Sequence, residues 1–360
     1  MPYLHHITIE GFRSIRKLDL DLRDVNVLIG ANGAGKSNFL AAFNFLREVR
    51  FGRLQEYTRA AAGANRILHF GSKTTSQVSV VVQFGIAPLR HYALDLAVDK
   101  RDSFFVRNES GVDGSQIVPT PPSGHEAGIS VDEADDQPAL LEIRETLADC
   151  NVYHFNDTSD TSPMKTSCDV EDNRALRPDG RNVAAMLYRL KQKEPVAYKR
   201  VLAAVRQIAP FVQNFVLQPS ALDEQKIYLE WQHAKHDGRF DGSYMSDGTL
   251  RFICLAVLLL QPDSMRPSLI LLDEPEIGLH PAAIALLAEM IQSAASSSQL
   301  IVSTQSPLLL DYFAPEDVLV TGRDDEATTV ERLSADELGD WLEEYSLGQI
   351  WEKNLIGGRP

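Results

Sequence analysis

VNVLIGANGAGKSN, residues Val25 to Asn38, is the most informative stretch of this 360-residue chain. An apolar strand ends in glycine, G-x-x-x-x-G-K-S follows, and the segment from Ser37 to Val49 has helical periodicity. A chance glycine turn needs neither the strand nor the helix, so the pattern favours a loop whose backbone N–H groups wrap phosphates. It predicts an α/β nucleotide-binding core in which Lys36 reaches the β- and γ-phosphates and Ser37 binds Mg²⁺.

Apolar runs elsewhere in the chain extend this α/β pattern. Strands are predicted at HITIEGF, LDLDL, SLILLD and QLIVST, and three runs at 78–85, 92–98 and 103–108 indicate an antiparallel sheet. Helices are predicted at Asn182–Ile208 with a break at Pro195, at Gly248–Leu260 and at Pro281–Ser293. The polar segments 119–138 and 157–180 are predicted to be exposed loops.

Composition narrows the classes of function. The 35 Lys and Arg residues against 50 Asp and Glu residues give a formal net charge of −15, which is unfavourable for a general polyanion binder. The three cysteines are scattered without C-x-x-C spacing, which fits a reduced, cytoplasmic compartment. The longest apolar run, Phe252–Leu260, is too short to span a membrane, and the first residues hold no apolar signal core.

A second apolar strand, in SLILLDEPEIGLHP (268–281), ends in two carboxylates. Asp273 lies where P-loop proteins place a Mg²⁺-holding aspartate, and Glu274 can polarise an attacking water. Alone, the segment would equally be a strand followed by an acidic turn. Together with the P-loop, it predicts nucleotide hydrolysis and not binding alone.

MSDGTLRF, Met245 to Phe252, has the residues of a helix start. Ser246 or Asp247 can cap free backbone N–H groups, and an ordinary cap is the simpler interpretation of this segment in isolation. Helix N-termini also bind anions, so the alternative is that this segment faces a phosphate.

Three segments, GANGAGKSN, MSDGTLR and LILLDEPEIGLHP, together resemble the ATPase heads of the ABC class. The resemblance is to the branch that holds the RecF repair protein, structural-maintenance-of-chromosomes (SMC) proteins and overcoming-lysogenization-defect (OLD) ATPases. The opening ITIEGFRSIRKLDLDL matches that branch, and YSLGQIWEKNLIGGRP resembles the ending of one bacterial group within it.

This resemblance implies a fold and a division of the chain. A single α/β P-loop head is expected over residues 1–325, with its core at 1–60 and 150–325. Within it an antiparallel β-lobe is expected near 66–118 and a helical lobe that carries the signature segment near 182–262. Residues 326–360 are expected to form a tail that packs on the head.

In this family the signature segment faces the γ-phosphate held by the P-loop of a second subunit. The resemblance therefore implies a homodimer of heads that sandwiches ATP, with Mg²⁺-dependent hydrolysis reopening it. ATP-binding residues are expected at Arg13, Asn32, Gly33, Gly35, Lys36, Ser37, Asn38, Ser246 and Gly248, metal ligands at Ser37, Asp273 and Asp157, and catalytic residues at Glu274 and Gln305. For Arg13, a plain surface arginine is an equal alternative.

Two segments depart from the family pattern. VYHFNDTS (152–159) stands where the family has a glutamine near Mg²⁺, so Asn156 or Asp157 is expected to replace it, and His154 is expected to be a packed strand histidine. IVSTQSP (301–307) carries Gln305 where a switch histidine is common. Glutamine hydrogen-bonds a phosphate or a water but carries no proton, so slow turnover is expected, and a polar strand cap is the alternative.

The biological setting has two competing hypotheses. The first is a cytoplasmic ATPase in DNA repair or anti-phage defence, with DNA as a partner that the charge does not favour. Because no coiled-coil heptads and no nuclease segment are recognised in the chain, a nuclease effector would act in trans. The second is a nucleotide-gated scaffold that controls a partner protein without contacting DNA.

Overall fold

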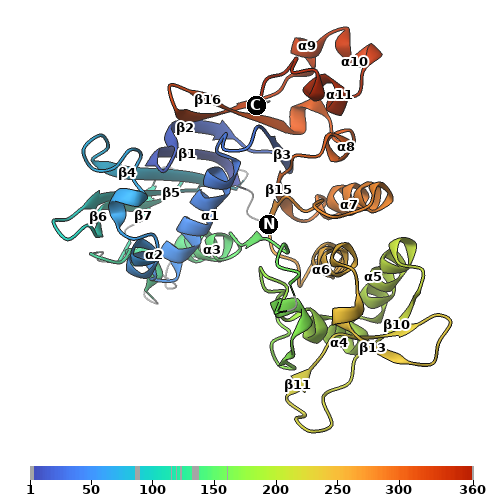
Figure 1. Cartoon of the computed structure of the whole chain (residues 1–360). Coiled ribbons are helices and arrows are strands. Elements are labelled where there is room, and N and C mark those ends of the chain that lie inside the picture. Colours follow the sequence, from blue (N-terminus) through green and yellow to red (C-terminus); the bar gives the residue numbers. More distant parts are fainter. Residues whose placement is uncertain are drawn as a thin grey trace.

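The computed structural model describes residues 4–358 apart from 86–89, 115, 119, 122–123, 132–137 and 160, and only the backbone of Glu337. Figure 1 shows an antiparallel β-lobe and a lobe of helices on either side of a central sheet, with the C-terminal region beyond strand β16. Of the helices described, none is long and apolar enough to cross a membrane.

The central sheet holds six strands in the order β17-β16-β3-β15-β14-β8. Their bounds are β3 Val25–Ile29, β8 Val152–Tyr153, β14 Leu269–Asp273, β15 Gln299–Ser303, β16 Val318–Asp324 and β17 Ala327–Arg332. All neighbours pair in parallel except β17, which is antiparallel to β16. The carboxyl ends of parallel strands meet at one edge of a sheet, so the segments after β3, β8, β14 and β15 gather there.

Both faces of the central sheet are buried because its strands are apolar on both sides. Leu269 and Leu271 belong to the core shared by the β-lobe and α1 (Lys36–Arg50), whereas Ile270 and Leu272 belong to the core of the helical lobe. α6 (Asp247–Leu260) and α7 (Pro281–Ala294) contribute to that second core. The predicted buried strands SLILLD and QLIVST are confirmed.

The β-lobe is one antiparallel sheet in the order β2-β1-β4-β5-β6-β7. Its strands are β1 Leu4–Phe12, β2 Ile15–Asp21, β4 Gln77–Phe84, β5 Arg90–Val98, β6 Phe104–Asp113 and β7 Gln116–Val118, and α2 (Leu54–Ala60) and α3 (Pro138–Ala148) lie in the same lobe. Every second residue of β4 is buried, as its alternating pattern predicts. The predicted antiparallel sheet is confirmed.

The helical lobe is built from α4 (Val183–Lys193), α5 (Pro195–Ile208) and α6, which pack together. The predicted break lies at Glu194, because Pro195 fits the first turn of a new helix and not the interior of an old one. Short strands complete the lobe: β10 Val212–Val216, β12 Glu230–His233 and β13 Arg239–Asp241 in one sheet, and β9 Cys168–Asp169 with β11 Lys226–Ile227 in another.

The C-terminal region consists of short helices beside the central sheet, namely α8 Pro307–Leu310, α9 Ala335–Leu338, α10 Trp341–Glu344 and α11 Leu347–Glu352. The backbone N–H of Gly348 in α11 donates to the Asp311 carboxylate at 2.6 Å, which fixes α11 beside α8. The division expected at 325/326 falls inside the β16–β17 hairpin, so β17 lies in the sheet and not in a separate tail.

The expectation that both polar segments are exposed loops is wrong in part. In 119–138, of which residues 119, 122–123 and 132–137 lie outside the described residues, Ala127 and Ile129 are buried. The Glu109 carboxylate accepts from the backbone N–H groups of Gly128 and Ile129 at 2.7 and 2.8 Å, and so lets a polar sequence fold inward. In 157–180, Met164 is likewise buried.

Candidate functional site

The P-loop connects β3 to α1, and Lys36 begins the helix. Its Nζ donates to the carbonyl oxygens of Gly30 at 2.6 Å and Ala31 at 3.2 Å. Burial lowers the pKa of Lys36, and the carboxylates of Glu274 and Asp273 oppose that shift. The ammonium is thus nearly enclosed, at 5% exposure, and held by loop carbonyls that a phosphate can replace.

One P-loop glycine is required by its neighbours as well as by its backbone. Gly35 has φ +119°, and a Cβ there would overlap the side chain of Thr328 on β17. The Thr328 hydroxyl donates to the carbonyl of Ala34 at 3.1 Å and pairs with Ser14 Oγ at 2.7 Å. The β1–β2 turn, β17 and the P-loop are therefore locked together.

Arg13 and Asn38, two residues expected to bind nucleotide, lie beside one another. Arg13 is in the left-handed region with φ +49°. Its guanidinium donates to Tyr57 Oη at 2.9 Å and to Asn38 Oδ1 at 3.5 Å, and Asn38 Nδ2 donates to Ser14 Oγ at 2.6 Å. Arg13 is therefore more than a plain surface arginine, and its contact with a phosphate stays a prediction.

Glu274 and Gln305, the two residues expected to act on water, meet at the carboxyl edge of the sheet. Gln305 Nε2 donates to Glu274 Oε1. The backbone N–H of Glu274 donates to Ser303 O at 2.9 Å, which extends the β14–β15 pairing, and Glu274 then turns with φ +48°. A positive φ at a non-glycine residue is uncommon, and such strain tends to occur at functional sites.

His154 is the first residue whose position the sequence did not predict. It was expected to be a packed strand histidine, but its side chain is 50% exposed and its Nδ1 lies 3.5 Å from Asp273 Oδ2. The hydrogen bond to Asp273 raises the pKa of His154, against the effect of partial burial. The expectation was wrong because β8 ends at Tyr153, which places the next residue at the edge where Asp273 also ends its strand.

Asp157 lies in the same loop but is engaged locally. Its Oδ1 accepts from the backbone N–H of Ser159 at 3.1 Å and from its hydroxyl at 2.7 Å. Within the described part of the chain, no group of three or more His, Cys, Asp or Glu side chains is arranged to hold a metal. A serine hydroxyl and an aspartate carboxylate, as at Ser37 and Asp273, are hard oxygen groups of the kind that suits Mg²⁺, and their contact with a metal stays a prediction. A metal contact of Asp157 stays a prediction.

The signature segment has the geometry of a helix cap. Ser246 Oγ accepts from the backbone N–H of Thr249 at 3.3 Å and pairs with its hydroxyl at 2.8 Å. A Cβ at Gly248 would come within 3.0 Å of the carbonyl oxygen of Gly278, in the turn after β14. Gly248 therefore allows close packing within its own subunit, and contact with a second subunit's ATP stays a prediction for both residues.

Arg251 is the second residue that the sequence did not single out. Its guanidinium donates to three main-chain carbonyls, Phe155 at 3.1 Å, Asn156 at 3.1 Å and Ile277 at 2.7 Å. These acceptors lie in the loop after β8 and in the turn after β14. Arg251 thus ties the signature helix to both loops, and only its position in MSDGTLR, after the cap residues, gave a sequence signal.

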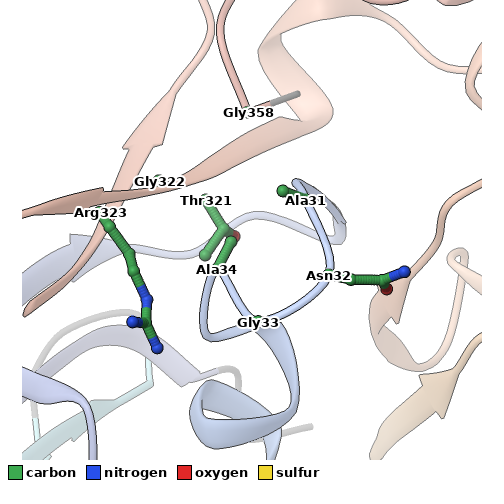
Figure 2. Close-up of a pocket in the computed structure, with 8 residues that line it drawn as sticks. All are labelled: Ala31, Asn32, Gly33, Ala34, Thr321, Gly322, Arg323 and Gly358. Atoms are coloured by element: carbon green, nitrogen blue, oxygen red, sulfur yellow. The ribbon is translucent and has the colours of Figure 1, made fainter. Parts of the chain in front are cut away.

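Two cavities flank the P-loop. One, of about 500 Å³, is lined by residues 31–34, by Thr321, Gly322 and Arg323, and by Gly358. Figure 2 shows Asn32 extending from the loop away from Arg323. The other, of about 190 Å³, is lined by residues 30–32, Gln305, Pro307, Trp351 and Glu352. The C-terminal segment therefore contributes to both sides of the expected nucleotide site.

Two family models match the chain. One, described as "AAA ATPase domain", matches residues 3–110, and the other, described as "AAA domain, putative AbiEii toxin, Type IV TA system", matches residues 151–311. Between them they include the P-loop, the loop after β8, the signature segment and the acidic end of β14.

Curated relatives match at low identity. The OLD nuclease of Thermus scotoductus is 21% identical over 375 residues, covering 99% of this chain and 68% of that protein. Endonuclease GajA of Bacillus cereus is 20% identical over 347 residues, covering 85% of this chain and 56% of that protein. RecF of Lactobacillus acidophilus is 47% identical over 49 residues, or 13% of each chain. The chain thus spans only part of RecF and about half of GajA.

Solved structures resemble the whole fold. An SMC head bound to the C-winged helix domain of ScpA has a TM-score of 0.64 at 18% identity, covering 93% of this chain and 99% of that one. An SMC head with an extended coiled coil from Pyrococcus furiosus has a TM-score of 0.60 at 17% identity, covering 96% and 99%. The expected fold class, an α/β P-loop head with a β-lobe and a helical lobe, is confirmed.

Proposed function

We propose that this chain, an ABC-class P-loop ATPase head of the RecF, SMC and OLD type, hydrolyses ATP with Mg²⁺ and closes with a second copy around ATP. The observation that carries the proposal is the Glu274–Gln305 hydrogen bond at the sheet edge that also holds the P-loop. A carboxylate and an amide side by side are suited to orient and polarise a water molecule.

In this proposal, different residues bind the phosphates, hold Mg²⁺ and activate the attacking water. Lys36 exchanges its two carbonyl acceptors for phosphate oxygens, and the P-loop N–H groups hold the β-phosphate. Ser37 and Asp273 hold Mg²⁺, which when bound neutralises charge on the β- and γ-phosphates. Glu274 accepts a hydrogen bond from the attacking water, and Gln305 fixes the direction of both groups without taking a proton.

Ser246 and Gly248 extend the proposal to a dimer. They lie at the N-terminus of the 14-residue helix α6, where N–H groups and the helix dipole favour an anion. We propose that they face the γ-phosphate of a second copy, so that ATP has a higher affinity for the closed pair. Arg13, Asn32, Gly33, Gly35 and Asn38 are proposed to contact the nucleotide in the same subunit, and Asp157 to approach Mg²⁺.

The solution mass of the Glu274→Gln protein, with and without ATP and Mg²⁺, tests this proposal. The substitution keeps the shape of residue 274 but weakens activation of water, so a closed dimer should accumulate only with ATP. Ser246→Arg in the same background should abolish that dimer. No nucleotide-dependent change in mass, together with an undiminished ATPase rate in wild-type protein carrying Ser246→Arg, would refute the dimer.

The last part of the proposal concerns the biological process in which this ATPase acts. We propose a role in DNA repair or anti-phage defence, supported by the similarity to RecF, the OLD nuclease and GajA. The net charge of −15 favours the second candidate, a scaffold that controls a partner protein without contacting DNA. Duplex and single-stranded DNA should stimulate ATP turnover in the first case and leave it unchanged in the second.

A further inference from the structure

Glu276 is a buried carboxyl group that the proposed hydrolysis does not use. It lies in the turn after β14, two residues beyond Glu274, and is only 7% exposed. Burial raises its pKa, and the nearby Glu274 carboxylate acts in the same direction. An acidic side chain is rarely buried to this extent unless its hydrogen bonds have a structural or functional purpose.

One oxygen of Glu276 is bound from two sides. Oε1 accepts from the hydroxyl of Thr304 at 2.6 Å and from the backbone N–H of Gln305 at 3.0 Å. Both donors lie in the loop after β15, the strand that neighbours β14 in the sheet. The other oxygen, Oε2, is buried and has no hydrogen-bond partner among the described residues.

These side-chain hydrogen bonds connect β14 and β15 beyond the last backbone hydrogen bond between the two strands. The ladder between β14 and β15 runs from Leu269 and Gln299 to Asp273 and Ser303, and its last backbone bond is that from Glu274 to Ser303. The next residue, Pro275, has no N–H to donate. The Glu276 side chain then crosses between the two loops and accepts hydrogen bonds from the Gln305 N–H and the Thr304 hydroxyl, beyond the last backbone bond of the ladder.

The link extends to the start of α8. Thr304 Oγ, which donates to Glu276, also accepts from the backbone N–H of Ser306 at 3.0 Å. Ser306 Oγ in turn accepts from Leu309 N at 3.1 Å and caps α8. A hydrogen bond at Glu276 therefore orders the whole segment that presents Gln305.

We propose that Glu276 is a positioning residue, which holds the Gln305 loop in register with the turn that carries Glu274. The inference rests on the proposed ATPase function, because it assigns Glu276 an effect on the geometry of the Glu274–Gln305 pair. In this role Glu276 acts through its bonds to Thr304 and Gln305, and not through contact with the nucleotide or the water. Its effect is on the rate of hydrolysis and not on ATP affinity or dimer closure, since misplacement of a catalytic group by about 1 Å costs up to about 10²-fold in rate.

Steady-state ATPase kinetics of Glu276→Leu and Glu276→Gln test the proposal, with Glu289→Gln on the exposed face of α7 as the matched control. Leucine removes the acceptor, so kcat should fall at least tenfold with KM unchanged, and in the Glu274→Gln background the ATP-dependent change in mass should also be unchanged. Glutamine keeps a carbonyl oxygen in the place of Oε1, so kcat should stay within about threefold of wild type. The control should leave both constants unchanged.

A second readout is independent of activity. The Gln305 N–H should exchange slowly with solvent in nucleotide-free wild-type protein and in Glu276→Gln, and faster in Glu276→Leu. An unchanged kcat and unchanged exchange in Glu276→Leu would overturn the proposal. So would equal losses of kcat in both variants, or loss of ATP affinity together with kcat. If wild-type protein hydrolyses no ATP, the proposed function fails, and hydrogen exchange still decides whether Glu276 orders the Gln305 loop.

Discussion

Replacement of Gly248 by alanine has two opposing effects on the free energy of unfolding, a gain in helix propensity and a clash with Gly278. The sign of the net change shows whether Gly248 is needed for packing within its own subunit. Gly248 is the second residue of α6, and alanine is favoured over glycine in helices by about 1 kcal/mol. The structure opposes this gain, because the new Cβ would lie within 3.0 Å of the Gly278 carbonyl oxygen, closer than real Cβ contacts. Overpacking of this kind costs about 1–3 kcal/mol, so we expect a net destabilisation of about 1 kcal/mol.

Urea unfolding without nucleotide, at two protein concentrations, measures this effect. Gly238→Ala is the matched control, because its Cβ would meet only the ring of Phe240 at 3.5 Å, and it should change stability by less than about 0.5 kcal/mol. The loss in Gly248→Ala should not depend on protein concentration, since the clash lies within one subunit. A variant that is as stable as wild type but no longer dimerises with ATP would refute the packing argument and assign Gly248 to the partner's nucleotide alone.

Three further predictions concern the loops around the site. Arg251→Met should lower the free energy of unfolding by about 2 kcal/mol, because three main-chain carbonyls lose a charged donor; Arg251→Lys, which keeps one donor group, should lose less in the same denaturation series. Gln305→Ala should lower the single-turnover rate of phosphate release about 10- to 100-fold with unchanged ATP affinity, and an unchanged rate would reduce Gln305 to a strand cap. Because burial raises the pKa of Glu276, the folded state holds its proton more tightly than the unfolded chain. Wild-type stability relative to Glu276→Gln should therefore be greatest below the ordinary glutamate pKa of about 4.3 and fall as pH rises through the raised pKa. Parallel curves for the two proteins in pH-dependent unfolding would show that Glu276 does not titrate differently on folding.

Local patterns of apolar and polar residues were enough to predict much of the fold from the sequence. The apolar run before GANGAGKSN, the alternation in β4 and the proline that begins α5 each act within a few residues, where backbone preferences and side-chain period operate. The acidic end of β14 and the position of Gln305 after β15 were predictable for the same reason. Parallel strands, once recognised, bring their carboxyl ends together without further information.

Residue types alone gave wrong predictions of burial at two places where burial depends on residues distant in the sequence. The segment around Ala127 is polar in composition, yet it is buried because Glu109 binds its backbone N–H groups from another strand. His154 has the sequence context of a strand residue, yet the strand ends one residue earlier and places it against Asp273.

Local sequence alone predicts the P-loop, the two acidic strand-end residues, the helix cap at Ser246 and the α/β class, because each depends on the order of neighbouring residues. The contacts of Arg251 with the loop after β8 join residues that lie 95 and 96 positions apart, and those of Glu276 with the loop after β15 join residues 28 and 29 positions apart. Such contacts exist only when β8, β14 and β15 are adjacent in one sheet and α6 packs on its face. Hydrogen bonds between strand ends follow from strand order, which a one-dimensional pattern of apolar and polar residues does not contain.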